Sequence, residues 1–429
     1  MLLSPQLLKI IKLSRNLPAS KLITFSFFML ILFIISGCGA SKKFEKEESN
    51  AIENYNDNSS LIRVLLDERM NLFSYTVEDP VVIKNELKTI SHSDKGDILK
   101  FYPDGNNVKL EMDGKTYLSK FYQILPETKR SIKVSDKSYK GAFRIASQNN
   151  KIQVINTITL EEYIKGVVPM EMPIGKGTEN YEVLKAFSIC VRTYAIKKLN
   201  SKNNFDIYND VRDQVYGGES SERILSNKAV RETRGLVLTY NNSPAATFYH
   251  STCGGYTEDG TNVFQTKNAP YLQSIKDGDE PYCSISPKYQ WKEIYSESDF
   301  IHRLKAAELI SGPEWKLDKI NVNSRFQSGR VNELQITLQN DNGKDKIIKI
   351  YGNNIRKIIR SSDNLSILNS TLFDISIDEK NNVVITGKGN GHGVGLCQWG
   401  AINLSRMGKD FVYILSHYYP GTKILRYYD

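Results

Sequence analysis

The segment YEVLKAFSICVRTYAIKKL, which runs from Tyr181 to Leu199, indicates a helix at the centre of a folded domain. Its large apolar residues recur at three- and four-residue intervals on one face, and smaller apolar residues fill the positions beside them. We therefore expect this helix to be mostly buried. Arg192 belongs to its polar stripe, and a buried guanidinium group needs an anionic partner or ligand. The alternative is that the Arg192 side chain extends to the surface.

The stretch VVPMEMP (residues 167–173), directly before this helix, places Glu171 between two prolines. Each proline fixes its own φ and shifts the residue before it towards extended geometry, so we expect a rigid loop rather than a helix. A nearby Arg192 would lower the pKa of Glu171, whereas burial would raise it, here through Val168, Met170 and Met172. Glu171 is therefore a candidate proton donor, and the alternative is an ordinary loop glutamate paired with a lysine.

Other segments predict strands and further helices around this centre. The run Leu61–Leu66 is typical of a buried strand, and alternating segments continue to about Lys129, which predicts a β-rich leading region over residues 59–130. We expect a hairpin whose strands are 235–240 and 245–250, a helix over 297–309, and strands over 331–338 and 346–351. The predicted fold class is α+β.

The N-terminus has the pattern of an export signal. Residues 1–37 carry four basic residues and no acid, followed by about 14 apolar residues, which is short for a membrane span of about 20. Ile35-Ser36-Gly37-Cys38 resembles the bacterial lipobox, in which the cysteine becomes lipid-modified. We therefore predict a lipoprotein anchored to a membrane through Cys38, rather than an uncleaved anchor. Residues 38–58 are polar and predict a disordered tether to a body at the cell envelope.

Composition and charge exclude little else. The chain of 429 residues is 40% hydrophobic and 24% charged, which is ordinary for a globular protein. Its formal net charge of +9 falls to +5 without the four basic residues of the signal, and the remaining charges are dispersed. Nucleic-acid binding is therefore not supported. A mildly positive surface suits an anionic wall polymer or lipid surface, and equally suits plain solubility.

Four cysteines follow the lipobox. Cys253 and Cys283 lie in loop-like sequence, and in an exported protein they are the plausible disulfide pair, closing about 30 residues for roughly 3 kcal/mol. The alternative is a zinc site formed by His250, Cys253 and Cys283, which lacks an evident fourth ligand. Cys190 lies on the apolar helix and is interpreted as core packing.

The segment 387–401, GKGNGHGVGLCQWGA, has five alternate glycines. This pattern does not fit an ordinary strand or helix, and it predicts a loop that lies close against another backbone or a ligand. His392 and Gln398 are its polar contact residues. The strand, helix and acidic residue of a dinucleotide-binding fingerprint are not all present, so phosphate binding is disfavoured. His392 is interpreted as a structural hydrogen-bonding residue, with a base or ligand role as the alternative.

Taken together, these motifs resemble the sporulation stage II D and amidase-enhancer family (SpoIID/LytB). The resemblance covers residues 150–422 and is carried by Ile158–Pro173, Val191–Ala195, Asp213–Gly218, His250–Gly255, Pro270–Leu272, the glycine loop and Leu415–Thr422. It implies a SpoIID/LytB-like domain over residues 131–429, with core motifs at 150–262. It also implies an exported lytic transglycosylase that cleaves peptidoglycan glycan strands without stem peptides, leaves 1,6-anhydro ends and needs no cofactor.

The resemblance also assigns roles to residues. Glu171 matches the catalytic glutamate, and Arg192 would orient it or bind the glycan. The other residues expected to border the cleft are Gln214, Tyr271, Gln273, His392 and Gln398. Gln273 stands where some enzymatic members have a basic residue. Residues 200–216 lack the Cys/His zinc cluster of some members, so no metal is expected there, and Cys397 replaces a common serine, which we interpret as packing.

A second function of another class remains open. Members with the same motifs are named as enhancers of a cell-wall amidase, and such a protein would bind wall glycan or the amidase without cleaving glycan itself. Gln273 mildly favours this reading. A purely structural lipoprotein that scaffolds a wall complex is the third alternative, and it leaves Glu171 without a role.

Overall fold

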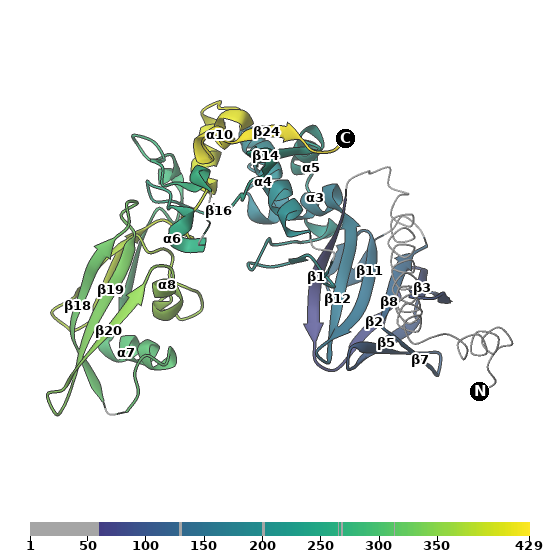
Figure 1. Cartoon of the computed structure of the whole chain (residues 1–429), viewed down its shortest axis with the longest axis horizontal. Helices are drawn as coiled ribbons and strands as arrows, with labels where there is room; N and C mark the ends of the chain where they lie inside the picture. Colours follow the sequence, from purple (N-terminus) through teal and green to yellow (C-terminus); the bar gives the residue numbers. More distant parts are fainter. Residues whose placement is uncertain (1–59, 128–130, 200–201, 265, 267–268, 313) are drawn as a thin grey trace, which may run out of the picture.

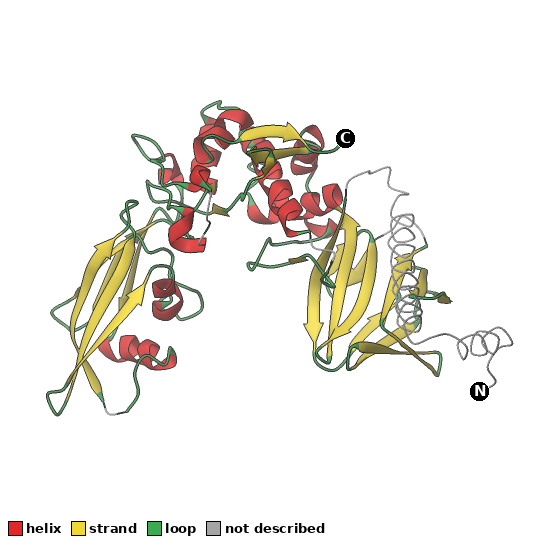
Figure 2. Ribbon diagram, viewed as in Figure 1, coloured by secondary structure: helices red, strands yellow, loops and turns green. Residues whose placement is uncertain are grey.

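A computed structural model describes residues 60–127, 131–199, 202–264, 266, 269–312 and 314–429 (Figure 1). The predicted signal, the predicted lipid attachment at Cys38 and the predicted tether lie outside the described residues. The structure combines sheets with helices, which confirms the predicted α+β class (Figure 2). In the part of the chain that is described, no helix is both long and apolar enough to cross a membrane.

The leading region consists of β-sheets. A seven-stranded sheet has the strand order β13-β1-β12-β11-β8-β3-β4, and a four-stranded sheet has the order β2-β5-β6-β7. The predicted strand at residues 61–66 is the start of β1, which pairs antiparallel with β12 from Leu61 opposite Thr159. The strands are β1 (Leu61–Arg69), β2 (Phe73–Thr76), β3 (Val81–Asn85), β4 (Thr89–Ser93), β5 (Ile98–Asp104), β6 (Asn107–Met112), β7 (Lys115–Ser119), β8 (Phe121–Pro126), β9 (Ile132–Val134), β10 (Lys137–Tyr139), β11 (Ala142–Gln148), β12 (Lys151–Thr159) and β13 (Ile207–Tyr208).

Helices form the centre of the molecule, between the leading sheets and a second β-rich unit (Figure 1). The predicted buried helix is α4 (Tyr181–Lys198), and its apolar residues Val183, Leu184 and Phe187 are fully buried. One hydrophobic core extends from Ile62 to Tyr419, so the leading sheets and the helices pack as a continuous body. The other helical elements of this centre are α3 (Leu160–Glu171), η2 (Glu219–Ser221), α5 (Ile224–Glu232), α6 (Gly260–Phe264), η3 (Pro270–Leu272), η4 (Tyr282–Ile285), α9 (Gln398–Arg406) and α10 (Phe411–Tyr418).

Within the span expected as one domain, the structure contains an insertion with its own hydrophobic core, from Tyr295 to Ile385. Alternating residues of β19 are buried, as its strand pattern predicts. The predicted helix at 297–309 ends slightly earlier, at Ala306. The elements are β17 (Gln290–Tyr295), α7 (Glu297–Ala306), β18 (Trp315–Arg325), β19 (Val331–Asn340), β20 (Asp345–Tyr351), α8 (Asn354–Ile359), β21 (Phe373–Ile377) and β22 (Val383–Lys388).

The predicted hairpin at residues 235–250 is only partly correct. The turn forms, and β14 (Leu236–Tyr240) pairs with the short β15 (Ser243–Pro244), but β14 takes the C-terminal β24 (Lys423–Arg426) as its other neighbour. The expected second strand continues into β16 (Tyr249–His250), which pairs in parallel with β23 (Leu396–Cys397). A contact between segments almost 150 residues apart replaces the local one, because the glycine loop supplies a closer partner.

The glycine loop lies against the backbone that follows β16, as its pattern predicts. Gly389 has φ +80°, and a Cβ there would lie 2.6 Å from the carbonyl oxygen of Thr252. Gly395 has φ +72°, and a Cβ there would lie 2.1 Å from the carbonyl oxygen of Phe248. Two backbones can approach this closely only where one has no side chain. The loop therefore brings His392 and Gln398 to the segment that contains His250.

Candidate functional site

A cleft of about 340 Å³ opens where α3, α4, β16 and the glycine loop meet. Of the predicted site residues, Glu171, His392 and Gln398 line it. The other lining residues are Tyr194, Val211, Arg212, Asp213, Phe248, Tyr249, His250, Ser251, Phe264 and Gly391. The structure thus brings together two segments that are far apart in the sequence, residues 167–173 and the glycine loop.

Glu171 is the last residue of α3, which corrects the predicted loop. Pro169 lies inside the last turn of this helix, and Met172 N–H still donates to the Val168 carbonyl at 2.9 Å. A proline inside a helix costs about 3 kcal/mol. Here the buried apolar side of α3 offsets this cost, through the fully buried Tyr163, Ile164, Val167 and Val168. The helix ends before Pro173, so Glu171 lies at a fixed helix terminus.

The Glu171 carboxyl group is half-buried and has one strong hydrogen bond. Its Oε1 accepts from the Val215 N–H at 2.7 Å. Burial raises the pKa of Glu171 above its usual value, although this hydrogen bond acts in the opposite direction. Among the described residues, Glu171 forms no salt bridge. A carboxyl group in this setting retains its proton more readily than an exposed glutamate.

Of the apolar neighbours expected to bury Glu171, two are themselves buried and one is not. Val168 is fully buried and Met172 is 1% exposed, whereas Met170 is 44% exposed. Since Met170 points largely to solvent, the rest of the burial comes from residues distant in sequence.

Gln398 connects the two sides of the cleft. It is the first residue of α9, and its side-chain amide donates to the Glu171 backbone carbonyl at 2.7 Å. This hydrogen bond satisfies one of the carbonyls that a helix end leaves without an intrahelical partner. Gln398 therefore fixes the C-terminal end of α3 against the N-terminal end of α9.

Two histidines lie together in the cleft, with ring centroids 5.6 Å apart. His392 Nδ1 accepts from the Val394 N–H at 3.1 Å, whereas His250 Nδ1 lies 3.1 Å from the Val394 carbonyl oxygen. Burial lowers the pKa of His392 to about 3 and the pKa of His250 well below its usual value, so both rings are neutral at neutral pH. These contacts place the proton on Nε2 of His392 and on Nδ1 of His250. The His392 ring also has a hydrogen bond to the Tyr249 backbone, whereas Nε2 of His250 has no hydrogen-bond partner among the described residues.

Aromatic rings form much of the remaining cleft wall. Phe248 and Phe264 are stacked with centroids 4.2 Å apart, and Phe264 meets the His392 ring edge-on at 4.9 Å. Tyr194 projects from α4 and donates to Asp213 Oδ1 at 2.8 Å. Rigid aromatic faces beside polar groups are suited to a ligand with both apolar faces and hydroxyl groups.

Asp213 is a second carboxylate in the cleft, but its oxygens are engaged. Besides the Tyr194 hydroxyl group, Oδ1 contacts Lys198 Nζ at 2.7 Å, and Oδ2 accepts from the Tyr208 N–H at 2.9 Å. These three donors occupy both oxygens of the Asp213 carboxylate. Glu171 and Asp213 are therefore arranged for different tasks.

Arg192 does not contact Glu171, which corrects its predicted role. Its guanidinium group is fully buried and forms a two-point salt bridge with Glu161, with Nε–Oε1 at 2.8 Å and Nη2–Oε2 at 2.9 Å. Further hydrogen bonds reach the carbonyls of Leu236 and Val230. Arg192 thus joins α3, α4 and β14 inside the core. The expected need for an anionic partner holds, but the partner is at the other end of α3.

Three other predicted residues lie outside the cleft lining. Gln214 is fully buried, and its Oε1 accepts from the Tyr163 hydroxyl group at 3.2 Å. Tyr271 is 6% exposed and accepts from the Ala246 N–H at 2.8 Å. Gln273 is exposed at the surface. Gln214 and Tyr271 therefore support the site from beneath rather than border it.

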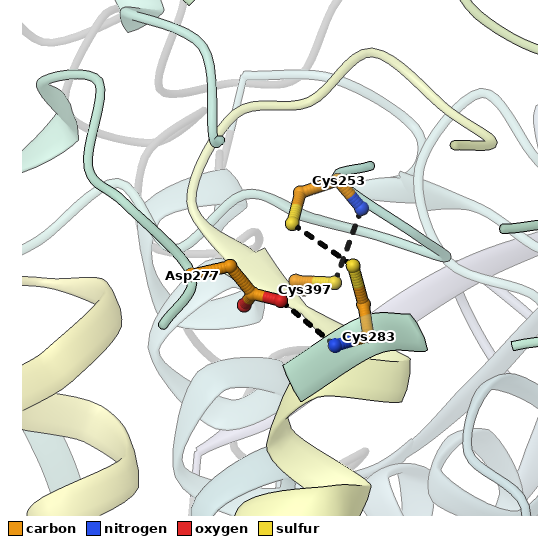
Figure 3. A group of neighbouring side chains, drawn as sticks. All are labelled: Cys253, Asp277, Cys283 and Cys397. Carbon is orange, nitrogen blue, oxygen red and sulfur yellow. Dashed lines mark hydrogen bonds between the residues drawn. The ribbon is translucent and has the colours of Figure 1, made fainter. Parts of the chain in front are cut away.

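The expected disulfide is not formed in this structure, where Cys253 and Cys283 are both free. Their sulfur atoms are neighbours, 3.4 Å apart, as the predicted pairing requires. Figure 3 shows that Cys397 and Asp277 point to the same place. His250, the third ligand of the alternative zinc site, is not in this group.

His250, Asp213 and Tyr194 line the cleft but were not predicted as cleft residues. Each lies next to a feature that was identified, since His250 precedes Cys253 and Asp213 precedes Gln214. Tyr194 was assigned to the apolar face of its helix. The contact of the Tyr194 ring with Phe248 and its hydrogen bond to Asp213 reveal that this face extends to the cleft.

Comparison with known proteins shows two matching regions. Residues 148–240 match the family described as Stage II sporulation protein, and residues 283–395 match a domain of unknown function, which coincides with the inserted β-rich unit. The chain is 31% identical to an uncharacterized protein of Brachyspira hyodysenteriae, over 71% of this chain and 77% of that protein. It is 30% identical to Stage II sporulation protein D of Bacillus subtilis, over 63% and 76% respectively. It is also 29% identical to the amidase enhancer of Bacillus subtilis, over 75% of this chain and 49% of that protein.

Proposed function

The chain belongs to the stage II sporulation protein D family, whose role is related to the cell wall, and we propose that it is an exported lytic transglycosylase of peptidoglycan. The observation that carries this proposal is the position of Glu171. Its half-buried carboxyl group lies in a cleft, has a raised pKa and has no salt-bridge partner among the described residues. A general acid needs these properties to hold a proton near neutral pH.

The proposed reaction uses one carboxyl group twice. Protonated Glu171 gives its proton to the glycosidic oxygen as the bond to the sugar carbon breaks. The resulting carboxylate then removes the proton from the 6-hydroxyl of the same sugar, whose oxygen bonds to that carbon. The product is a 1,6-anhydro sugar, and no water is consumed. A second catalytic carboxylate is therefore not required, unlike in glycosidases that activate water or form a glycosyl-enzyme.

The rest of the cleft supports binding of a glycan strand. Nε2 of His250 is a buried acceptor with no hydrogen-bond partner among the described residues. A sugar hydroxyl group or acetamido N–H supplies the complement. The Phe248 and Phe264 rings provide apolar surface for a sugar face. The Asp213 carboxylate accepts from three donors and holds Tyr194 in place.

The location and substrate are part of the same proposal. The lipobox at Cys38 would attach the mature chain to a membrane at the cell envelope, where wall glycan is within reach. We further propose that the glycan strands lack stem peptides.

The second candidate function is enhancement of a cell-wall amidase without glycan cleavage. The similarity to the amidase enhancer over 75% of this chain favours it, as does the exposed, uncharged Gln273. The inserted unit adds a groove of about 610 Å³ beside Trp291 and Phe373, outside the cleft, where a partner protein would find additional surface.

Fragment release separates these functions. The purified full chain is incubated with peptide-free glycan strands, and in parallel with intact wall and a purified amidase. Soluble glycan fragments released by the chain alone support the transglycosylase. No release, together with faster amidase action, supports the enhancer. Glu182→Gln is a matched control, because Glu182 lies on α4 outside the cleft, its salt bridge with Lys185 is partly exposed, and glutamine can still accept from the Phe411 N–H.

A further inference from the structure

Three sulfur atoms and one carboxylate converge in the interior of the protein (Figure 3). Their donor atoms all lie within 4.8 Å of one another, and all four residues are fully buried. They come from three distant segments, which are the turn after β16, the loop leading into η4, and β23. The residues are Cys253, Asp277, Cys283 and Cys397. Most free cysteines pack as small apolar groups, but these sulfurs face one another and a carboxylate.

The spacing fits a small tetrahedral ion. With zinc–sulfur bonds of about 2.3 Å, sulfurs at tetrahedral corners are about 3.8 Å apart. The Cys253 and Cys283 sulfurs are 3.4 Å apart, and no donor pair exceeds 4.8 Å. Shifts of a few tenths of an ångström to about one ångström would bring all four donors into contact with one ion. A set of three thiolates and one carboxylate favours zinc over magnesium or calcium, which prefer oxygen ligands.

Backbone N–H groups point at the sulfurs. The Cys253 N–H donates to Cys397 Sγ at 3.2 Å, and the Gly255 N–H donates to Cys253 Sγ at 3.4 Å. The second bond depends on the Cys253-Gly254-Gly255 turn, in which φ is +79° at Gly254 and +118° at Gly255. Hydrogen bonds from N–H groups stabilise ionised sulfur, the form that binds metal.

The carboxylate is also oriented. Asp277 Oδ1 accepts from the Tyr418 hydroxyl group at 2.7 Å, and Oδ2 accepts from the Cys283 N–H at 2.8 Å. Outer hydrogen bonds of this kind hold metal ligands in position. Asp277 is fully buried and has no salt bridge among the described residues, so its charge would otherwise lack a nearby cation.

Arg330 places positive charge near the cluster. Its guanidinium group is 1% exposed and donates to the carbonyls of Cys253 at 2.6 Å and Tyr256 at 2.9 Å. It interacts electrostatically with three of the four cluster residues, and also with the buried Glu258. Four anionic ligands around a divalent ion leave excess negative charge, and Arg330 partly offsets it.

A disulfide accounts for fewer of these observations. Joining Cys253 to Cys283 would leave Cys397 as a buried thiol, and Asp277 as a buried carboxylate without a cation. A metal ion engages all four groups at once. We propose that this chain binds one Zn²⁺ in a closed structural site whose ligands are Cys253, Asp277, Cys283 and Cys397.

The site would stabilise the cleft without taking part in chemistry. Cys397 directly precedes Gln398, whose side chain holds the Glu171 carbonyl, and Cys253 follows the segment of His250 and Ser251. Four protein ligands leave no open position for substrate or water. The ion would therefore fix α9 and the glycine loop relative to α3. This inference holds whether or not Glu171 proves to be an acid catalyst.

Metal content and cobalt spectroscopy test the site directly. The full chain is purified under reducing conditions without chelators, and its metals are measured by mass spectrometry. We expect one zinc per chain, and replacement by Co²⁺ should give thiolate charge-transfer absorption with tetrahedral d–d bands. Cys397→Ser and Asp277→Asn should weaken zinc binding by more than about tenfold. Cys190→Ser, which removes a buried cysteine outside the cluster, should leave it unchanged.

Several outcomes would overturn the proposal. The first is that the reduced wild-type chain binds neither zinc nor cobalt. The second is that Cys397→Ser contains as much zinc as the wild type. The third is that a Cys253–Cys283 disulfide peptide is recovered from metal-free native protein. Iron in place of zinc would overturn the choice of metal. The wild-type cobalt spectrum requires no variant, so the test stands even if Cys397→Ser fails to fold.

Discussion

The two ends of α3 carry glutamates in opposite environments. At the first turn, Glu161 is buried against Arg192 in a two-point salt bridge and also accepts from the Tyr428 hydroxyl group. At the last residue, Glu171 is half-buried in a cleft, and among the described hydrogen bonds its carboxyl group accepts only the Val215 N–H. The same residue type on one helix thus serves the core at one end and is available for proton transfer at the other. Burial alone does not define a catalytic acid, because the partner decides whether the charge is stabilised.

The largest expected effect is on glycan cleavage by Glu171→Gln. Glutamine retains the shape and can still accept from the Val215 N–H, but it has no proton to transfer. We expect the cleavage rate to fall by about 10²- to 10⁴-fold, measured as soluble fragments released per folded molecule. Cleavage at the wild-type rate would remove Glu171 from the mechanism.

Next is the effect of Glu161→Gln on stability. This variant leaves the buried Arg192 without its counter-charge, so we expect a loss of about 3–5 kcal/mol in the free energy of unfolding, measured with urea. Glu182→Gln should cost less than about 1 kcal/mol, because its salt bridge is partly exposed. Molecules of Glu161→Gln that remain folded should still cleave glycan. Unchanged stability would show that the Glu161–Arg192 salt bridge does not stabilise the core.

A smaller effect is expected from Gln398→Ala. Loss of the hydrogen bond to the Glu171 carbonyl should lower stability by about 1 kcal/mol. The displaced helix end should slow cleavage by about 10- to 100-fold, since small shifts of a reacting group are costly. Gln398→Asn, shorter by one methylene group, should have a similar effect. An unaltered rate in both variants would argue that the end of α3 is held without Gln398.

The smallest effect concerns pH. Burial raises the pKa of Glu171 in the folded state above its pKa in the unfolded state, so the folded protein binds this proton more tightly. The resulting contribution to stability is fully present below the unfolded-state pKa. It is lost as pH rises through the folded-state pKa. Glu171→Gln should therefore be slightly more stable than wild type at neutral pH, with the difference vanishing below about pH 4. Cleavage by the wild type should decline as pH rises through the same range. Urea unfolding across pH measures the stability difference, and initial cleavage rates across pH measure the activity. If Glu171→Gln were less stable than wild type at neutral pH, this result would contradict the raised pKa of Glu171.

Local patterns in the sequence were sufficient to predict much of this arrangement. Helical spacing predicted α4 and its burial, and the glycines of residues 387–395 predicted a loop in close contact with another backbone. The prolines around Glu171 predicted a loop, which is wrong because α3 extends to Glu171. The free energy that keeps Pro169 in this helix comes from tertiary packing, which the local sequence does not reveal. Proximity in sequence likewise suggested Glu171 as the partner of Arg192, whereas the fold places Glu161 there.

Other features depend on contacts that no local pattern encodes. The pairing of β16 with β23 joins residues 249–250 to 396–397, and this contact brings Cys397 to Cys253. Cys397 was interpreted as packing because it replaces a residue that is commonly serine in the glycine loop, and no local pattern suggests a ligand. The insertion with its own core was not separated from the surrounding domain either, because its strands resemble those on both sides.

The central claim is that Glu171 cleaves glycan without water. Its most direct test is the mass of the new ends after the full chain, wild type or Glu171→Gln, acts on peptide-free glycan strands. We predict fragments from the wild type that end in 1,6-anhydro sugars, each lighter than a hydrolysis product by one water, and none from Glu171→Gln. Ends with a free reducing sugar, or anhydro ends formed equally by Glu171→Gln, would contradict the account.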